Sequence, residues 1–312
     1  MSSLRFGWHM PSFAMGDMSA PDLIQHITNT LACIQGHFHS AWSDDHVHPW
    51  APFVDDSAPA LECLSTLGFL AAQFPQLHFG SLVVCQAYRN PALLAKTVAN
   101  LQLLTGGRMI LGLGAGWFEG EFRAYGYNFP RPAVRIAQLA EAIQVVRKLW
   151  TESPASFQGN YYQLQNAYCE PRPTPLPPIM VGGGGEQLTL RVVAQYADWW
   201  NLDIKTPAEY TRKRAILQQH CAAVGRDETQ ITKMYSAELV AIDEDEARAR
   251  RLAAASPFYR PETSLVGTPA QIVARLRAYT AVGAQVVSMR FADFPDTHGI
   301  TLFAERVIPQ FA

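Results

Sequence analysis

The chain has 312 residues, of which 48% are hydrophobic and 17% are charged, so it is long enough to bury one large apolar core. A formal net charge of -2 and scattered Lys and Arg residues leave no basic surface, which argues against nucleic acid as a partner. No apolar run approaches the roughly 20 residues of a membrane span, and residues 1–10 lack the features of a signal peptide. The sequence therefore predicts a single domain over residues 1–312, located in the cytoplasm and away from membranes.

Short apolar segments alternate along the chain with longer segments of helical periodicity, the pattern of repeated βα units. The helix predicted over residues 91–105 opens with proline and ends at two glycines, and the helix over 135–150 carries one apolar stripe. The eight predicted strands are residues 4–10, 39–43, 77–84, 109–113, 179–181, 199–202, 234–242 and 285–290. Eight such units predict an α/β fold closed into a (β/α)8 TIM barrel.

Three segments are longer than ordinary connections between barrel elements: residues 118–133, 153–178 and 243–268. We expect them to be insertions over the carboxyl-terminal face of the barrel, where they would serve as lids. The chemistry of such a barrel lies on the loops that follow its strands, so the candidate site residues are sought there.

Four consecutive glycines, Gly182, Gly183, Gly184 and Gly185, follow the predicted strand 179–181 and precede Glu186 and a helix start. Glycines let successive backbone N–H groups point inward, and a helix amino terminus attracts anions, so this loop is a candidate phosphate site. A tight turn is the alternative, although it needs only one or two glycines. The absence of a following Gly-Lys-Ser/Thr excludes a nucleoside-triphosphate loop.

Glycines also follow the strand 109–113, in the sequence Gly112-Leu113-Gly114-Ala115-Gly116-Trp117. A flat ring system could lie on such a surface beside Trp117. The spacing is GxGxG and no acidic residue stands about 20 positions further on, so a dinucleotide-binding fold is not indicated. The alternative is that these glycines only allow close packing within the barrel.

The segment 36–50 holds four of the nine histidines and follows the second predicted strand. An imidazole beside a carboxylate suits proton transfer, so His46 is the candidate acid/base and Asp45 the residue that orients it. A solvated loop is one alternative. The pairs His37/His39 and His46/His48 raise another, a metal-dependent hydrolase, although no downstream ligands are evident and no metal site is predicted.

The five cysteines are widely spaced and include no CxxC pair, so they predict ordinary buried thiols. Cys85 differs in its position, because it ends the predicted strand 77–84 and could support a ring system. A plain strand and loop is the alternative here.

These segments together resemble the luciferase-like monooxygenases, in particular their deazaflavin-dependent branch, over nearly the whole chain. The resemblance rests on residues 107–118 followed by Glu121, Tyr125-Gly126 and Arg135, and on residues 178–186 followed by 194–201. It implies a cofactor ring between the ends of the third and fourth strands, a cis peptide near Leu82-Val83, and a phosphate on the glycine loop. The cofactor-binding residues so implied are Leu82, Val83, Cys85, Gly114, Ala115, Gly116, Trp117, Gly182, Gly183, Gly184, Gly185 and Glu186.

The function implied is hydride transfer between coenzyme F-420 and a small organic substrate, with His46 assisting proton transfer. The alternatives are an FMN-dependent monooxygenase that takes reduced flavin from a partner reductase, and a non-catalytic flavin-binding protein. The family's habit also implies a homodimer. The chain departs from the family at His37, where glycine is common, and at Trp117, where some sugar-oxidising relatives carry an acid.

Overall fold

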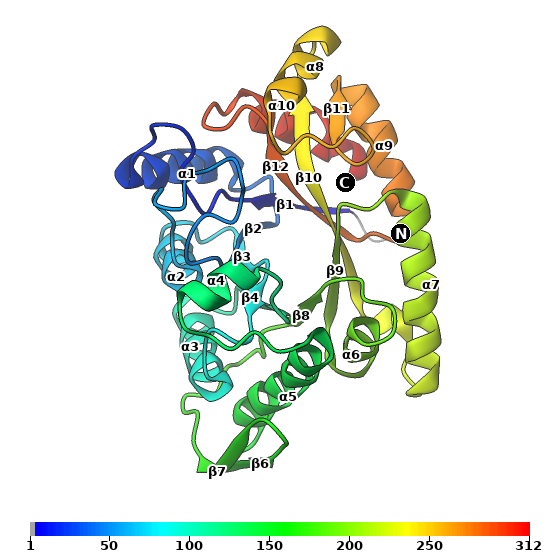
Figure 1. The fold of residues 1–312 in the computed structure, drawn as a ribbon. Coiled ribbons are helices and arrows are strands. Elements are labelled where there is room, and N and C mark those ends of the chain that lie inside the picture. Colours follow the sequence, from blue (N-terminus) through cyan, green and yellow to red (C-terminus); the bar gives the residue numbers. More distant parts are fainter. Residues whose placement is uncertain (1–3) are drawn as a thin grey trace.

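The computed structural model describes residues 4–312 and contains a closed parallel barrel of eight strands, which confirms the predicted (β/α)8 fold (Figure 1). The ring closes because β1 pairs with β12 on one side and β2 on the other, while β10 joins β9 to β12. Its strands are β1 (Arg5–His9), β2 (Ser40–Ser43), β3 (His78–Ser81) with β4 (Val84–Cys85), β5 (Met109–Gly114), β8 (Ile179–Gly182), β9 (Trp199–Asp203), β10 (Thr232–Ile242) and β12 (Val286–Phe291).

Helices form the outer layer, and both predicted helices are present, as α3 and α5. Three of the layer's helices begin with a capping box, Ser19 with Asp22, Thr206 with Glu209 and Thr268 with Gln271, which satisfies backbone N–H groups of the first turn. The helices of the layer are α1 (Ala20–Ile34), α2 (Cys63–Gln73), α3 (Pro91–Leu104), α5 (Pro132–Thr151), α6 (Thr189–Tyr196), α7 (Pro207–Ala223), α9 (Pro269–Ala281) and α10 (His298–Arg306), with short 3₁₀ turns η1 (Glu228–Gln230) and η2 (Ile308–Phe311).

The third barrel strand is interrupted, whereas the sequence predicted one strand over residues 77–84. A cis peptide joins Leu82 to Val83, at the position that the family resemblance implies. The Leu82 N–H still donates to the Ser43 carbonyl of β2, but after the cis bond β4 pairs with β5 instead. The interruption places Leu82 and Val83 at the barrel mouth.

Two of the three predicted insertions lie over the carboxyl-terminal end of the barrel. Residues 118–133 contain α4 (Glu119–Ala124), and residues 243–268 contain α8 (Glu246–Ala255) and β11 (Leu265–Gly267), which extends the sheet beside β10. Phe118 and Arg260 from these segments line the cavity at that end. They therefore cover the site as expected.

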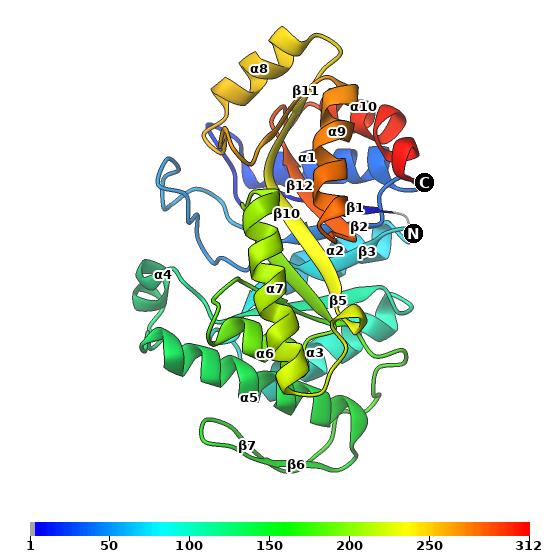
Figure 2. The same cartoon turned by 90° about the vertical axis from the view of Figure 1, so that its right-hand side faces the viewer.

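The third insertion, residues 153–178, is not a lid, so that expectation was wrong. It forms a hairpin, β6 (Ala155–Gln158) and β7 (Gln163–Ala167), that lies along the outside of α5 (Figure 2). The buried carboxylate of Glu141 on α5 holds the hairpin turn by accepting the N–H groups of Asn160, Tyr161 and Tyr162. The insertion follows α5 to the opposite end of the barrel, because barrel helices run antiparallel to the strands.

The barrel interior is filled by side chains rather than open. A buried cluster gathers one residue from each of six strands: Trp42, Ile110, Met180, Trp199, Met234 and Val286. A larger apolar cluster packs the strands against the surrounding helices. Within residues 4–312, no helix combines the length and the apolar character that crossing a bilayer requires.

Candidate active site

A cavity of about 600 Å³ opens at the carboxyl ends of the barrel strands, within the size range of cofactor and small-molecule sites. Every barrel strand, or the loop directly after it, contributes to the wall: His9, Asp45, Leu82, Gly114, Gly182, Asn201, Ser236 and Arg290. The loops after parallel strands converge at this end, which explains why residues distant in sequence meet here.

Most of the predicted site residues line this one cavity. They are Asp45, His46, Leu82, Val83, Cys85, Gly114, Ala115, Gly116, Trp117, Gly182 and Gly183. Gly184, Gly185 and Glu186 lie outside its wall. Burial raises the pKa of the Cys85 thiol to about 12, so Cys85 contributes an uncharged surface.

The glycines of the two predicted loops make room for Val83. A Cβ on Gly114 would stand 2.6 Å from a Val83 methyl group, and one on Gly182 would stand 3.1 Å from the other methyl group. Gly116 is constrained separately, by the Cys85 sulfur at 2.7 Å from its would-be Cβ. The glycines therefore do allow close packing, which was the alternative that the sequence left open. The side chain that they make room for, Val83, is itself part of the cavity wall. Val83, Gly114 and Gly182 form one apolar part of the cavity wall, here called the Val83 platform.

The glycine loop is tied to the helix layer on its outer side. Lys213 on α7 donates to the Gly184 carbonyl and to the Glu186 carboxylate, both at 2.8 Å, and Arg212 also pairs with Glu186. Glu186 was predicted to contact the cofactor; instead its carboxylate faces α7 and anchors the loop. Gly183 and Thr189 line the cavity at this point.

His46 is oriented by Glu121 rather than by Asp45. The His46 Nδ1–H donates to Glu121 Oε2 at 2.9 Å, and the same carboxylate accepts from the Val47 N–H at 2.6 Å and the Tyr88 hydroxyl at 2.5 Å. Burial alone would raise the pKa of Glu121, but these donors hold it below its usual value. An ionised Glu121 favours a proton on His46 Nδ1, which leaves Nε2 as the ring nitrogen that faces away from this carboxylate.

Asp45 was predicted to orient His46, and its contacts contradict that role. Its two oxygens each accept from Arg89 at 2.7 Å, in a bidentate pair, and Oδ2 also accepts from the Cys85 N–H at 3.0 Å. Asp45 thus links the end of β2 to β4 and fixes the backbone that carries the Val83 platform.

A second buried network, which the sequence did not predict, surrounds Asp44. Arg290 donates to Asp44 Oδ2 at 2.8 Å, and the same Arg290 nitrogen lies 2.8 Å from His9 Nε2, which is 2.7 Å from Asp44 Oδ1. Burial would raise the pKa of Asp44, but His9 and Arg290 hold it well below its usual range. The network joins the ends of β1, β2 and β12 at one side of the cavity.

The histidine pairs that suggested a metal centre do not converge. His39 precedes β2 and stacks on His78 at 4.5 Å, whereas His46 and His48 follow β2 at the opposite end of the barrel. Across residues 4–312, no group of three or more His, Cys, Asp or Glu side chains has the arrangement of a metal site. Aromatic rings of Trp50, Trp117 and Phe118 surround His46 instead, which restricts its access to water.

The comparisons with known proteins agree with this geometry. A family model of luciferase-like monooxygenases matches residues 4–262. The chain belongs to this family. The resemblance that the sequence predicted is therefore confirmed.

Relatives of both cofactor types are found. Over 213 residues the chain is 34% identical to an F420-dependent glucose-6-phosphate dehydrogenase of Kineococcus radiotolerans. The match covers 67% of this chain and 61% of that enzyme, so the chain spans less than two thirds of the enzyme's length. Over 257 residues it is 27% identical to an FMNH(2)-dependent dimethylsulfone monooxygenase of Pseudomonas putida, covering 70% of each. A solved F420-dependent secondary alcohol dehydrogenase, in complex with an F420-acetone adduct, shares the fold with a TM-score of 0.84 and 21% identity over 100% of both chains.

Proposed function

We propose that this luciferase-like protein binds coenzyme F-420 and transfers hydride between it and a small organic substrate. The observation that carries the proposal is the position of the Val83 platform and the His46–Glu121 pair in the wall of one cavity. The F420-dependent relative supports the choice of cofactor. Coenzyme F-420 would supply a two-electron hydride acceptor and donor.

The residues present fit such a cofactor. The Val83 platform would offer an apolar surface to a ring, and any residue larger than glycine at position 114 or 182 would displace Val83 from it. Gly183 and Thr189 would lie beside the phosphate, where the start of α6 favours an anion. His46, oriented by Glu121, would accept or return the proton of the reacting hydroxyl group through Nε2.

The alternative is an FMN-dependent monooxygenase, favoured by the match to the Pseudomonas enzyme over 70% of both chains. That function would need a reductase to supply reduced flavin. In either case the platform and the glycine loop hold the cofactor, so the two functions differ in which ring binds more tightly. A homodimer is proposed from the family's habit alone.

The test is a calorimetric titration of the protein with oxidised coenzyme F-420, oxidised FMN and reduced FMN. Gly182→Leu, which would displace Val83, should abolish binding, whereas Gln187→Leu, an exposed position in the same loop, should leave it unchanged. Preference for coenzyme F-420 supports the proposal, and preference for reduced FMN supports the alternative. Binding of neither cofactor would overturn both.

A further inference from the structure

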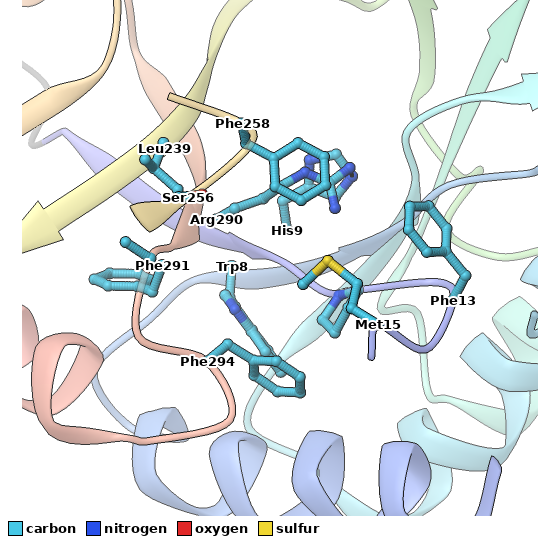
Figure 3. A pocket seen from close by; sticks show the side chains of 12 residues that line it. Trp8, His9, Phe13, Met15, Leu239, Ser256, Phe258, Arg290, Phe291 and Phe294 are labelled. Carbon is cyan, nitrogen blue, oxygen red and sulfur yellow. Dashed lines mark hydrogen bonds between the residues drawn. The ribbon is translucent and has the colours of Figure 1, made fainter. Parts of the chain in front are cut away.

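A second, smaller cavity of about 50 Å³ lies beside the main one, between the ends of β1 and β12; we call it the side pocket. Its wall is mostly apolar, with Trp8, Phe13, Met15, Leu239, Phe258 and Phe294 around it, and it also contains His9, Ser256 and Arg290 (Figure 3). Trp8 and Leu239 are 1% exposed, so these side chains belong to the core of the protein. The apolar side chains of this wall favour the binding of an apolar group.

The side pocket and the main cavity share two polar residues, His9 and Arg290. Figure 3 shows both beneath the ring of Phe258, and the Arg290 guanidinium lies 5.4 Å from that ring's centre. His9 and Arg290 therefore stand at the boundary between the two cavities.

Arg290 has one donor without an acceptor. Its side chain is 8% exposed, and its Nε–H is buried without a hydrogen-bond partner among the residues that the structure describes. A buried N–H group of this kind is destabilising unless a ligand supplies an oxygen. The positive charge of Arg290, in contrast, is already neutralised by Asp44 at 2.8 Å. Arg290 therefore needs a neutral hydrogen-bond acceptor for its Nε–H group and does not need a second anion for its charge.

We propose that Arg290 and the side pocket select an uncharged substrate in which a carbonyl oxygen stands next to a short alkyl group. The carbonyl oxygen accepts the Arg290 Nε–H, and the alkyl group enters the side pocket. This inference rests on the proposed function, since it assumes that a carbinol of the same substrate reacts near His46. Esters of β-hydroxy acids combine the three groups.

The reaction on such an ester is balanced. The carbinol C–H bond breaks and its hydride, with both electrons, reduces the bound coenzyme, while the hydroxyl proton passes to His46 Nε2. The carbinol becomes a ketone, and the ester group is unchanged. The ester serves for recognition only.

The size of the side pocket limits the alkyl group. A cavity needs roughly 10–15 Å³ on this measure to hold one water molecule, so 50 Å³ accepts about three or four groups of that size. Burial of each methylene should raise kcat/KM about fourfold until the pocket is full. We therefore expect kcat/KM to rise from methyl to propyl 3-hydroxybutyrate and to fall for the octyl ester.

The experiment measures kcat/KM with coenzyme F-420 for the methyl, ethyl, propyl and octyl esters and for 2-heptanol, which lacks the second oxygen. Ala292→Leu narrows the side pocket and should abolish the advantage of the propyl over the methyl ester, while Ala222→Leu, exposed on α7, should not. Arg290→Lys keeps a charge opposite Asp44 but removes Nε. It should reduce a roughly tenfold preference for the propyl ester over 2-heptanol to parity.

Binding of propyl 3-hydroxybutyrate to the protein without cofactor is followed in parallel by ligand-observed NMR. Binding that is lost in Ala292→Leu, without turnover, would support the side pocket and contradict the proposed function. Turnover that does not depend on alkyl length, or that Ala292→Leu leaves unchanged, would overturn the side pocket. Absence of both binding and turnover would also overturn it.

Discussion

His39 makes the stability of the barrel depend on pH. Its ring stacks on His78 at the amino end of β2, and its Nδ1 atom is buried without a hydrogen-bond partner in the described part of the chain. Burial, together with the positive charges of His78 and Arg5, lowers the pKa of His39 to about 3. The folded protein therefore keeps His39 neutral at pH 5, whereas the unfolded chain protonates it.

The sign and size of the effect follow from proton linkage. The unfolded state binds one more proton than the folded state at low pH. The contribution of neutral His39 to the free energy of unfolding is therefore fully present above the ordinary histidine pKa of about 6.5, and the free energy of unfolding falls as the pH drops below that value. Between pH 7 and pH 5 the loss amounts to about 2 kcal/mol for this one group. His39→Phe keeps a stacked ring and removes the titration, so the variant should lose about 2 kcal/mol less than the wild type over this range.

Urea unfolding at pH 7, 6 and 5 measures this difference. His37→Gln, an exposed position two residues earlier, controls for the loss of a histidine from the same loop. The wild type and His37→Gln should lose stability in parallel, while His39→Phe should retain more of it at pH 5. If all three proteins show the same dependence on pH, His39 is not held neutral in the folded state and the reasoning fails.

Three further predictions concern the site. Glu121→Gln should lower turnover about 100-fold, because the amide offers only one acceptor oxygen to its three donors and no longer fixes the His46 proton; steady-state kinetics would show no loss if another group orients the ring. Gly114→Ala should cost about 1–3 kcal/mol in urea unfolding by displacing Val83, and the addition of Val83→Ala should restore most of it, unless the space is not shared. Arg89→Met should destabilise the fold by about 3–5 kcal/mol, since it leaves a buried carboxylate without its partner, and a shift of the unfolding midpoint below 1 kcal/mol would contradict this.

The fold was predictable because its signals are local. Apolar periodicity and the glycine or proline residues at segment ends predicted the barrel strands and both assigned helices, and the structure confirms them. The position of residues 153–178 was not predictable in the same way. It depends on the buried carboxylate of Glu141, in the middle of a helix, accepting three N–H groups of a hairpin turn, and periodicity carries no information about that contact.

The membership of the site was predictable to a lesser degree. Glycines after strands indicate loops at the barrel mouth, so the sequence predicted Gly114 and Gly182 as site residues. It did not predict that these two glycines make room for Val83. Glu121 belonged to the family signature, yet nothing local assigns it to His46, which lies 75 positions away. Arg290, similarly, is 246 positions from Asp44. Such pairs are set by barrel closure, which spacing along the chain does not encode.

The segment Asp44-Asp45-His46 shows why adjacency in sequence was misleading. The three side chains leave the end of β2 in different directions, so each meets different neighbours: Asp44 pairs with Arg290, Asp45 with Arg89, and His46 with Glu121. The carboxylates of Asp44, Asp45 and Glu121 are buried, and each accepts from a different side chain of the three pairs. The three carboxylates therefore do not compete for the same donor. The His46–Glu121 hydrogen bond is therefore separate from the Arg89 pair that supports the platform and from the Arg290 pair that borders the side pocket. A substitution in one pair should change cofactor binding, proton transfer or substrate choice largely by itself.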